Sequence, residues 1–362
     1  MTKKSVIEDR LEKAARNLLL HCGGFSPGSE ILILHEDPAL GWYDEALPKT
    51  VARQAERLGL KPKCVMVGAP SELLDPVTAE LSERYGNVIY FARIGDQDRF
   101  AEVQPGKTKI MCYLRNAEML ASDFATVDHG AMQSLKRAVD QVLLNARRIE
   151  ITCPLGSRIE GAPADVTPGE SAEVSIRRFP LGVPQPLDAR GFGGRVALAR
   201  YLTPTGSKAY EPAFLKLETP VFAQIEAGRI VSFSGDAAAV DPVQRHYDHV
   251  SGLFAIDPAA VHSWHAGIHP GCSYGWAAED NPDRWSNTVF NNPRVLHFHT
   301  CGAYAPGEIC WMLLDPSVHV DGTALWEQGR LRPERFPQTQ ASLDEWPVLQ
   351  RLIDNPSMRI GV

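Results

Sequence analysis

Histidine placement carries most of the chemical information in this sequence. Eight of the eleven histidines lie in one fifth of the chain: His246, His249, His262, His265, His269, His297, His299 and His319. Four of the seven tryptophans lie in the same stretch: Trp264, Trp276, Trp285 and Trp311. Imidazole is the commonest metal ligand and titrates near neutral pH, and aromatic side chains line ligand pockets. The stretch therefore predicts a metal or acid–base site inside an aromatic-lined pocket.

Three local patterns narrow this prediction. Polar and apolar side chains alternate in residues 317–322, so on a strand His319 and Asp321 would point the same way. The two side chains are either a metal-ligand pair or part of an ordinary surface strand. Residues 296–299 also alternate and place His297 and His299 on one face, as ligands or as a hydrogen-bonded buried pair. Residues 262–270 carry three histidines, but Gly267 and Pro270 argue against a continuous helix there. We expect one of the three to be a ligand.

The elements that position these residues begin with an alternation of strands and helices. Short apolar runs at 30–34, 63–67, 87–91 and 109–114 are typical of strands buried on both faces. Helical patterns lie between them, at about 5–22, 48–58, 71–85 and 132–146. This order predicts an α/β domain with a mostly parallel sheet. The turn at 35–38 lacks the glycines of a dinucleotide-binding fingerprint, so no nucleotide is expected.

The pattern changes from residue 148 onward. Strand-like segments shorten, at 149–152, 196–199, 221–225 and 229–233, and proline and glycine multiply between them. The last two segments flank 226–228, which is expected to form the turn of a hairpin. We therefore predict an α/β domain at 1–147 and a β-rich (α+β) metal-binding domain at 148–362.

Composition excludes several classes of protein. The 362 residues are 44% apolar and 22% charged, which is typical of a globular enzyme and unlike a disordered chain or a coiled coil. A net charge of −7 without a Lys/Arg run gives no support to nucleic acid or an anionic membrane as a partner. The N-terminus lacks the apolar segment of a secretory signal, and no apolar run reaches the roughly 18 residues of a membrane span. A cytoplasmic protein is expected.

The order of the C-terminal motifs resembles the thermophilic metalloaminopeptidase family (aminopeptidase T type), and within it the branch that contains 2,5-dihydroxypyridine 5,6-dioxygenase. The sequence H-V-D at 319–321 matches the last motif of the family, a His-x-Asp metal pair on a strand. Residues 297–304 match an upstream motif of a histidine, a small-residue loop and a tyrosine. The sequence H-A-G at 265–267 is similar to the His-x-Gly motif of the dioxygenase branch, where the peptidases have a glutamate ligand.

This resemblance implies His265, His319 and Asp321 as the ligands of one Fe(II) ion, with Mn or Zn as other metals that the set can bind. Two imidazoles and one carboxylate form the facial triad of non-haem iron oxygenases. The implied activity is cleavage of the ring of a small hydroxylated aromatic or N-heteroaromatic compound by O2, in a catabolic pathway. Because relatives form oligomers, a homo-oligomer is also expected.

The resemblance also suggests secondary roles. Three side chains are candidates to accept the proton of a substrate hydroxyl: His297, His299 and Tyr304. Thr300 is a candidate to hydrogen-bond the substrate, and Trp264 or Trp276 to stack on its ring. The pyridine dioxygenases have a histidine before the proline that matches Pro180, whereas this chain has Arg177-Arg178-Phe179. We expect Arg178 either to bind a substrate carboxylate or to lie on a solvated strand edge.

Two other functions are compatible with the sequence. The first is a hydrolase, either of the peptidase branch or one that acts on an amide or amine of a small aromatic. Such an enzyme would contain two metal ions or one zinc and would not depend on O2. The second is a protein that binds a metal or ligand without catalysis. Variants of its metal-ligating residues would bind small molecules more weakly, and there would be no turnover for them to abolish. The surplus of titratable histidines beyond the expected ligands favours an enzyme.

Overall fold

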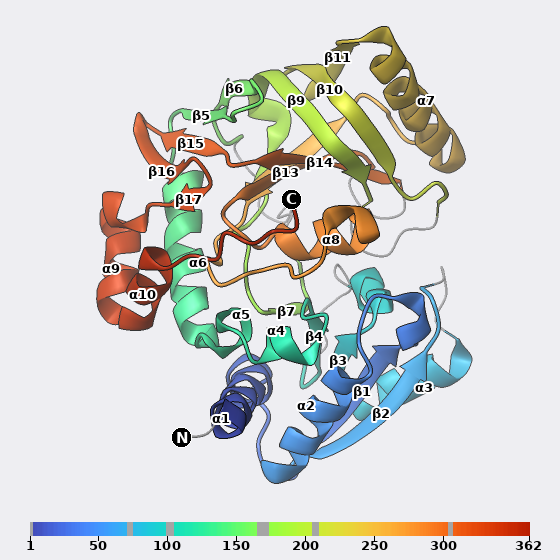
Figure 1. Cartoon of the computed structure of the whole chain (residues 1–362), viewed down its shortest axis with the longest axis vertical. Helices are drawn as coiled ribbons and strands as arrows, with labels where there is room; N and C mark the ends of the chain where they lie inside the picture. Colours follow the sequence, from blue (N-terminus) through green and yellow to red (C-terminus); the bar gives the residue numbers. More distant parts are fainter. Residues whose placement is uncertain (1–2, 71–74, 99–104, 165–173, 205–209, 303–306) are drawn as a thin grey trace. The chain divides into compact units, whose positions relative to one another are not determined.

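The computed structural model of the chain describes residues 3–70, 75–98, 105–164, 174–204, 210–302 and 307–362 (Figure 1). The chain divides into two compact units, one of residues 1–133 and 174–181 and one of residues 134–173 and 182–362. The division predicted at residue 147 lies just after the end of helix α6 (His129–Leu144), most of which belongs to the second unit. The first unit also contains strand β7 (Arg177–Phe179), because β7 pairs with a strand of that unit.

The first unit is built on a parallel sheet. Its five described strands have the order β2-β1-β3-β4-β7. They are β1 (Glu30–Glu36), β2 (Lys61–Val67), β3 (Asn87–Phe91), β4 (Thr108–Cys112) and β7. All four neighbouring pairs are parallel. The side chains from Ile31 to Leu34 are fully buried, as the continuous apolar run predicts for a strand inside a parallel sheet. The predicted α/β fold of this half is confirmed.

Helices connect and cover these strands. They are α1 (Lys3–Arg16), α2 (Ala46–Arg57), α3 (Pro76–Tyr85), α4 (Ala117–Leu120) and α5 (Asp123–Thr126), with a π-helical turn at Asn17–Cys22 and 3₁₀ turns at Pro38–Leu40 and Arg93–Asp98. The connections β1–β2 and β2–β3 run in opposite directions across the sheet, so right-handed crossovers place α2 and α3 on opposite faces.

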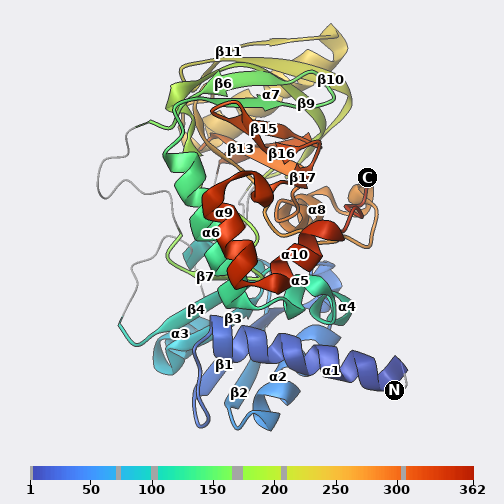
Figure 2. The same cartoon turned by 90° about the vertical axis from the view of Figure 1, so that its left-hand side faces the viewer.

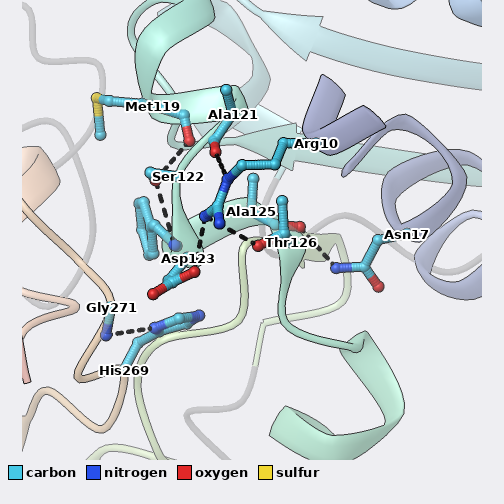
Figure 3. A network of polar contacts seen from close by, with 11 residues as sticks. Arg10, Asn17, Met119, Ala121, Ser122, Asp123, Ala125, Thr126, His269 and Gly271 are labelled. Carbon is cyan, nitrogen blue, oxygen red and sulfur yellow. Dashed lines mark hydrogen bonds and ion pairs between the residues drawn. The ribbon is translucent and has the colours of Figure 1, made fainter. Parts of the chain in front are cut away.

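Polar side chains fix α1 and the π-helical turn to the short helices that follow β4 (Figure 3). Arg10 Nη2 donates to Asp123 Oδ1 at 2.7 Å, and Asn17 Nδ2 donates to the main-chain oxygen of Ala125 at 2.8 Å. The Asn17 side chain also accepts the backbone N–H of His129 at 2.7 Å. Helix α5 ends and α6 begins between these two backbone groups, so neither has a hydrogen-bond partner within a helix. The Asn17 amide supplies the partner for both.

The second unit is built on an antiparallel sheet. Among the described residues its strands follow the order β17-β16-β15-β5-β6-β9-β14-β13-β12-β8, and β10 pairs with β9 and β11. The strands are β5 (Ile149–Thr152), β6 (Arg158–Gly161), β8 (Leu187–Asp188), β9 (Phe192–Thr203), β10 (Leu215–Glu226), β11 (Arg229–Ser234), β12 (Val261–Ala266), β13 (Val295–Cys301), β14 (Glu308–Leu314), β15 (Ser317–Val320), β16 (Thr323–Glu327) and β17 (Arg330–Leu331). The predicted β-rich half and its hairpin, now β10 and β11, are confirmed.

Helices pack on this sheet and beside it. They are α6, α7 (Ala237–Phe254), α8 (Pro282–Val289), α9 (Pro337–Glu345) and α10 (Pro347–Asp354), with 3₁₀ turns at Ala189–Gly191, Ala278–Asp280 and Pro333–Arg335. Helix α7 covers β10 and β11, where the rings of Tyr247 and Phe233 lie 5.3 Å apart (Figure 1). Helix α9 lies beside α6 in both views, and Ser134 Oγ donates to Glu345 Oε2 at 3.1 Å (Figures 1 and 2). Among the described helices, none has the length and apolar character that a bilayer crossing needs.

Candidate metal centre

Three histidines from two neighbouring strands meet on one face of the antiparallel sheet. His265 of β12 is the direct cross-strand partner of His297 of β13, and His299 follows His297 by two residues. Side chains two residues apart on a strand share a face, and direct cross-strand partners lie side by side. All three side chains are buried, and one ring nitrogen from each lies within 4.8 Å of the other two. Among the described residues this is the group that can hold a metal ion.

The spacing of the imidazoles suits a single ion. His265 Nε2 and His299 Nε2 are 3.1 Å apart, and the ring centroids of His265 and His297 are 4.0 Å apart. With metal–nitrogen bonds of about 2.1 Å, the nitrogens of neighbouring ligands lie about 3.0–3.4 Å apart. The Nε2 pair already has this separation, and a ring nitrogen of His297 lies within 4.8 Å of both. The residues present therefore fit one divalent metal ion.

A carboxylate lies behind one of these imidazoles. His299 Nδ1 donates to Glu308 Oε1 at 2.5 Å, and the side chains are 11% and 2% exposed. The hydrogen bond places the proton on Nδ1 and leaves the lone pair of Nε2 for a metal. Sequence reasoning missed Glu308. Residues 308–314 pair with residues 295–301, and alternation along this strand places Glu308 on the face of the histidines. Identifying Glu308 from the sequence would have required the register of the β13–β14 pair.

The sheet face continues onto β14 with sulfur-containing side chains. Cys310 pairs directly with His299, and Met312 pairs directly with His297. Both side chains are buried. On the other side of the cluster the Phe290 ring lies 5.4 Å from the His297 ring. The histidines are therefore enclosed by aromatic and sulfur-containing groups that exclude water and strengthen electrostatic interactions inside the site.

The other histidines of the 262–270 segment have separate roles. This segment is strand β12 followed by a loop, as Gly267 and Pro270 predict. His262 Nε2 contacts the main-chain oxygen of Cys301 at 2.6 Å, and His269 Nδ1 accepts the backbone N–H of Gly271 at 3.2 Å (Figure 3). Of the three candidates, only His265 belongs to the described metal-ligating group.

The structure does not bring His319 and Asp321 to this group, and the described group therefore differs from the ligand set expected from the sequence. His319 lies on β15, between Glu150 of β5 and Ala324 of β16. Asp321 has a φ of 49°, so it turns out of the strand and the alternation with His319 does not extend to it. Its Oδ1 accepts the backbone N–H groups of residues 147 and 148, at 3.1 and 2.9 Å. Asp321 thereby ties the turn between β15 and β16 to the residues that precede β5.

Two expected substrate contacts point to the opposite face of the sheet. Thr300 alternates with His299, and its Oγ1 donates to the main-chain oxygen of Ile309 at 2.8 Å. Trp264 alternates with His265, and its ring packs 5.5 Å from that of Phe192. Both side chains therefore support the strands from behind.

The two remaining site predictions have different outcomes. Arg178 lies in the first unit on β7, opposite Met111 of β4, so its substrate contact stays a prediction. Tyr304 lies outside the described residues.

Comparison with known proteins identifies the fold. No family model matches the chain, and no curated protein matches it in sequence. The structure is similar to 2,5-dihydroxypyridine dioxygenase from Pseudomonas putida KT2440, with a TM-score of 0.60 and 14% identity over 92% of this chain and 99% of that one. It is also similar to AmpT from Thermus thermophilus, with a TM-score of 0.49 and 14% identity over 90% and 99% of the two chains. The fold that the resemblance implied is confirmed.

Proposed function

We propose that this chain is an enzyme that binds one divalent metal ion through His265, His297 and His299 and cleaves the ring of a small hydroxylated aromatic or N-heteroaromatic compound with O2. The observation that carries the proposal is the buried three-imidazole group on one face of β12 and β13. Fe(II) is the metal that suits this activity. The fold shared with a 2,5-dihydroxypyridine dioxygenase supports a dioxygenase reaction.

The ligand chemistry favours one metal ion over two. Two adjacent cations need bridging anions, which in enzymes are mostly carboxylates. In the described part of the chain, the metal-ligating group consists of three imidazoles and contains no carboxylate. The nearby carboxylate of Glu308 accepts the hydrogen bond of His299 Nδ1 and acts behind the ligand. A dinuclear peptidase centre is therefore disfavoured.

The residues of this chain contribute positioning and exclusion of water. Three protein ligands leave further coordination positions for substrate and O2, and bound Fe(II) would supply the redox chemistry between them. Because His297 and His299 are ligands in this proposal, neither accepts the substrate hydroxyl proton; Tyr304 stays the predicted acceptor. Phe290 and Met312 line the histidines and favour a flat, apolar ring.

A second candidate has the same ligand set in its favour. Three histidines also hold catalytic zinc, which activates water for hydrolysis. A zinc hydrolase that acts on an amide or amine of a small aromatic is therefore the alternative. It differs from the dioxygenase in requiring no O2.

Metal analysis and oxygen uptake separate these proposals. Protein purified without oxygen is expected to contain about one iron per chain and to consume O2 with dihydroxylated pyridines or benzenes, whereas His297→Ala should do neither. About one zinc per chain, with turnover of amides and no O2 uptake, would select the hydrolase. Two ions per chain would contradict the mononuclear centre. Light scattering tests the homo-oligomer, which we propose from the family resemblance alone.

A further inference from the structure

We propose that Thr203 of β9 determines substrate specificity beside the metal centre, and that its hydroxyl hydrogen-bonds an uncharged polar substituent of the substrate ring. The inference rests on the proposed function, since it takes His265, His297 and His299 as the ligands of the ion that holds the ring hydroxyls. It adds a residue that contacts the substrate and a chemical class for the edge of the ring that points away from the metal.

Thr203 shares one face of the antiparallel sheet with His299. Thr203 is the direct partner of Cys310 on β14, and Cys310 is in turn the direct partner of His299 on β13. Direct cross-strand partners point to the same face, so these three side chains form one row on the face of the histidines. Trp311 follows Cys310 and points to the opposite face, where its Nε1 donates to the Tyr247 hydroxyl of α7 at 2.7 Å.

The Thr203 hydroxyl is a buried polar group without a partner. The residue is 0% exposed, and within the described part of the chain its Oγ1 has no hydrogen-bond partner. Two other fully buried threonines of this unit are paired: Thr300 Oγ1 donates to the main-chain oxygen of Ile309, and Thr288 Oγ1 to that of Arg284, both at 2.8 Å. An unpaired hydroxyl away from water costs free energy, and a ligand that supplies the partner removes this cost.

The separation of Thr203 from the metal ligands suits a small ring. Strand β14 lies between β9 and β13, so Thr203 and His299 are two strand spacings apart, about 10 Å. A ring that binds the ion through adjacent hydroxyls directs its far edge away from the metal. The ring, one substituent on that edge and a hydrogen bond together span this distance, with Cys310 beneath the ring.

Helix α8 covers the neighbouring row of the same face. Tyr201 precedes Thr203 by two residues on β9, and its ring lies 5.9 Å from the Trp285 ring of α8. At the other end of the helix, the Phe290 ring lies 5.4 Å from the His297 ring. The side chains of α8 therefore cover the row of Tyr201 and His297, and they form a wall beside the row of Thr203. A flat ring along that row leads from the metal to the threonine hydroxyl.

The chemistry of a hydroxyl defines the substituent. Threonine Oγ1 donates one hydrogen bond, accepts others and carries no charge. An ammonium or carboxylate buried against it stays uncompensated, which is costly. An amide, carbonyl or hydroxyl group instead exchanges a hydrogen bond with water for one with Thr203. The site is therefore expected to prefer a carboxamide to a methyl group or a carboxylate at the far edge of the ring, which differs from the selectivity expected if Arg178 bound a substrate carboxylate.

Ligand binding to zinc-loaded protein tests the inference without turnover. Dihydroxybenzamide, dihydroxytoluene and dihydroxybenzoate, each with two adjacent hydroxyls and a substituent across the ring from one of them, differ in that substituent alone. By calorimetry, wild type is expected to bind the amide about tenfold more tightly than the methyl compound, as one hydrogen bond implies, and the acid most weakly. Thr203→Val should lose the preference for the amide, and Thr203→Ser, which keeps a hydroxyl, should retain most of it.

A second threonine provides the matched control. Thr339 of α9 is also fully buried, but its hydroxyl donates to the main-chain oxygen of Pro333. Thr339→Val should keep the preference for the amide and unfold at a lower urea concentration than wild type. Thr203→Val removes an unpaired group, so it should unfold at the same urea concentration as wild type or a higher one. A threonine with a merely structural role would not combine weaker ligand binding with unchanged stability.

Each outcome decides the inference. An unchanged amide-to-methyl ratio in Thr203→Val, or equal binding of the two compounds by wild type, overturns it and leaves the metal content and O2 uptake of the proposed function intact. A lower urea midpoint for Thr203→Val than for wild type, or its failure to fold, would show that the hydroxyl is paired within the protein and would also overturn the inference. If none of the three compounds binds the zinc-loaded wild type, both proposals fail.

Discussion

Replacing Glu308 by Gln tests the hydrogen bond behind the metal ligands. The variant keeps the size of the side chain and an oxygen that can accept the His299 Nδ1 proton, but it removes the negative charge. Glu308 and His299 are almost completely buried, so solvent does not screen their interaction. Hydrogen bonds with a charged partner are about twice as strong as neutral ones, and partners that orient metal-bound histidines contribute about 10- to 100-fold in metal affinity. We therefore expect Glu308→Gln to bind zinc at least about tenfold more weakly, about 1.4 kcal/mol.

Competition with a chromophoric chelator at neutral pH measures this change. Glu226→Gln, at an exposed position of β10, serves as the matched control and should retain the wild-type affinity. Circular dichroism of both variants establishes that the fold is intact. An affinity of Glu308→Gln within about twofold of wild type would refute the argument that the carboxylate tunes His299.

Three further variants probe the surroundings of the site. Burial lowers the pKa of His246 to about 4 in the folded protein, whereas in the unfolded chain the pKa is about 6.5. As the pH falls from about 6.5 to 4, only the unfolded chain binds a proton at this residue, so the folded state loses stability over this range. Urea titrations at pH 7 and 4.5 measure the free energy of unfolding at each pH. The decrease between the two should be smaller in His246→Phe than in wild type, by up to about 3 kcal/mol, and an equal decrease would show that His246 does not cause it. Tyr247→Phe removes the hydroxyl that accepts the hydrogen bond of Trp311 Nε1 at 2.7 Å. The variant should lose about 1–3 kcal/mol of unfolding free energy in urea and keep its metal content. Loss of metal would show that Tyr247 and Trp311 do more than anchor α7. Asp321→Ala should cost about 1 kcal/mol of unfolding free energy, because two backbone N–H groups lose their acceptor, and it too should keep the metal. A variant depleted of metal would instead return Asp321 to the ligand set.

The fold could be predicted because its signals are local. Strand β1 sits in the interior of a parallel sheet, and such a strand must be apolar at every buried position, as residues 31–34 are. The β10–β11 hairpin is also local, since its turn lies at Ala227 and Gly228 and both have positive φ. Strand β7 could not be assigned to the first unit in this way. It pairs with β4 across more than sixty residues of intervening chain, and no local pattern encodes that pairing.

The site could be predicted only in part for the same reason. Alternation placed His297 and His299 on one face of a strand, but the cross-strand partnership of His265 and His297 depends on the register of two strands that are far apart in sequence. Alternation failed at Asp321, whose left-handed φ ends the extended conformation one residue after Val320. Glu308 was not recognised because it reaches His299 through the pairing of β13 with β14.

Metal content of three proteins tests the central claim most directly. Wild type, His297→Ala and His319→Ala would be expressed in parallel, purified without oxygen, and analysed for metal per chain by mass spectrometry. With His265, His297 and His299 as the ligands, wild type and His319→Ala contain about one ion per chain and His297→Ala contains almost none. The opposite result, an ion retained by His297→Ala and lost from His319→Ala, would contradict the three-imidazole centre.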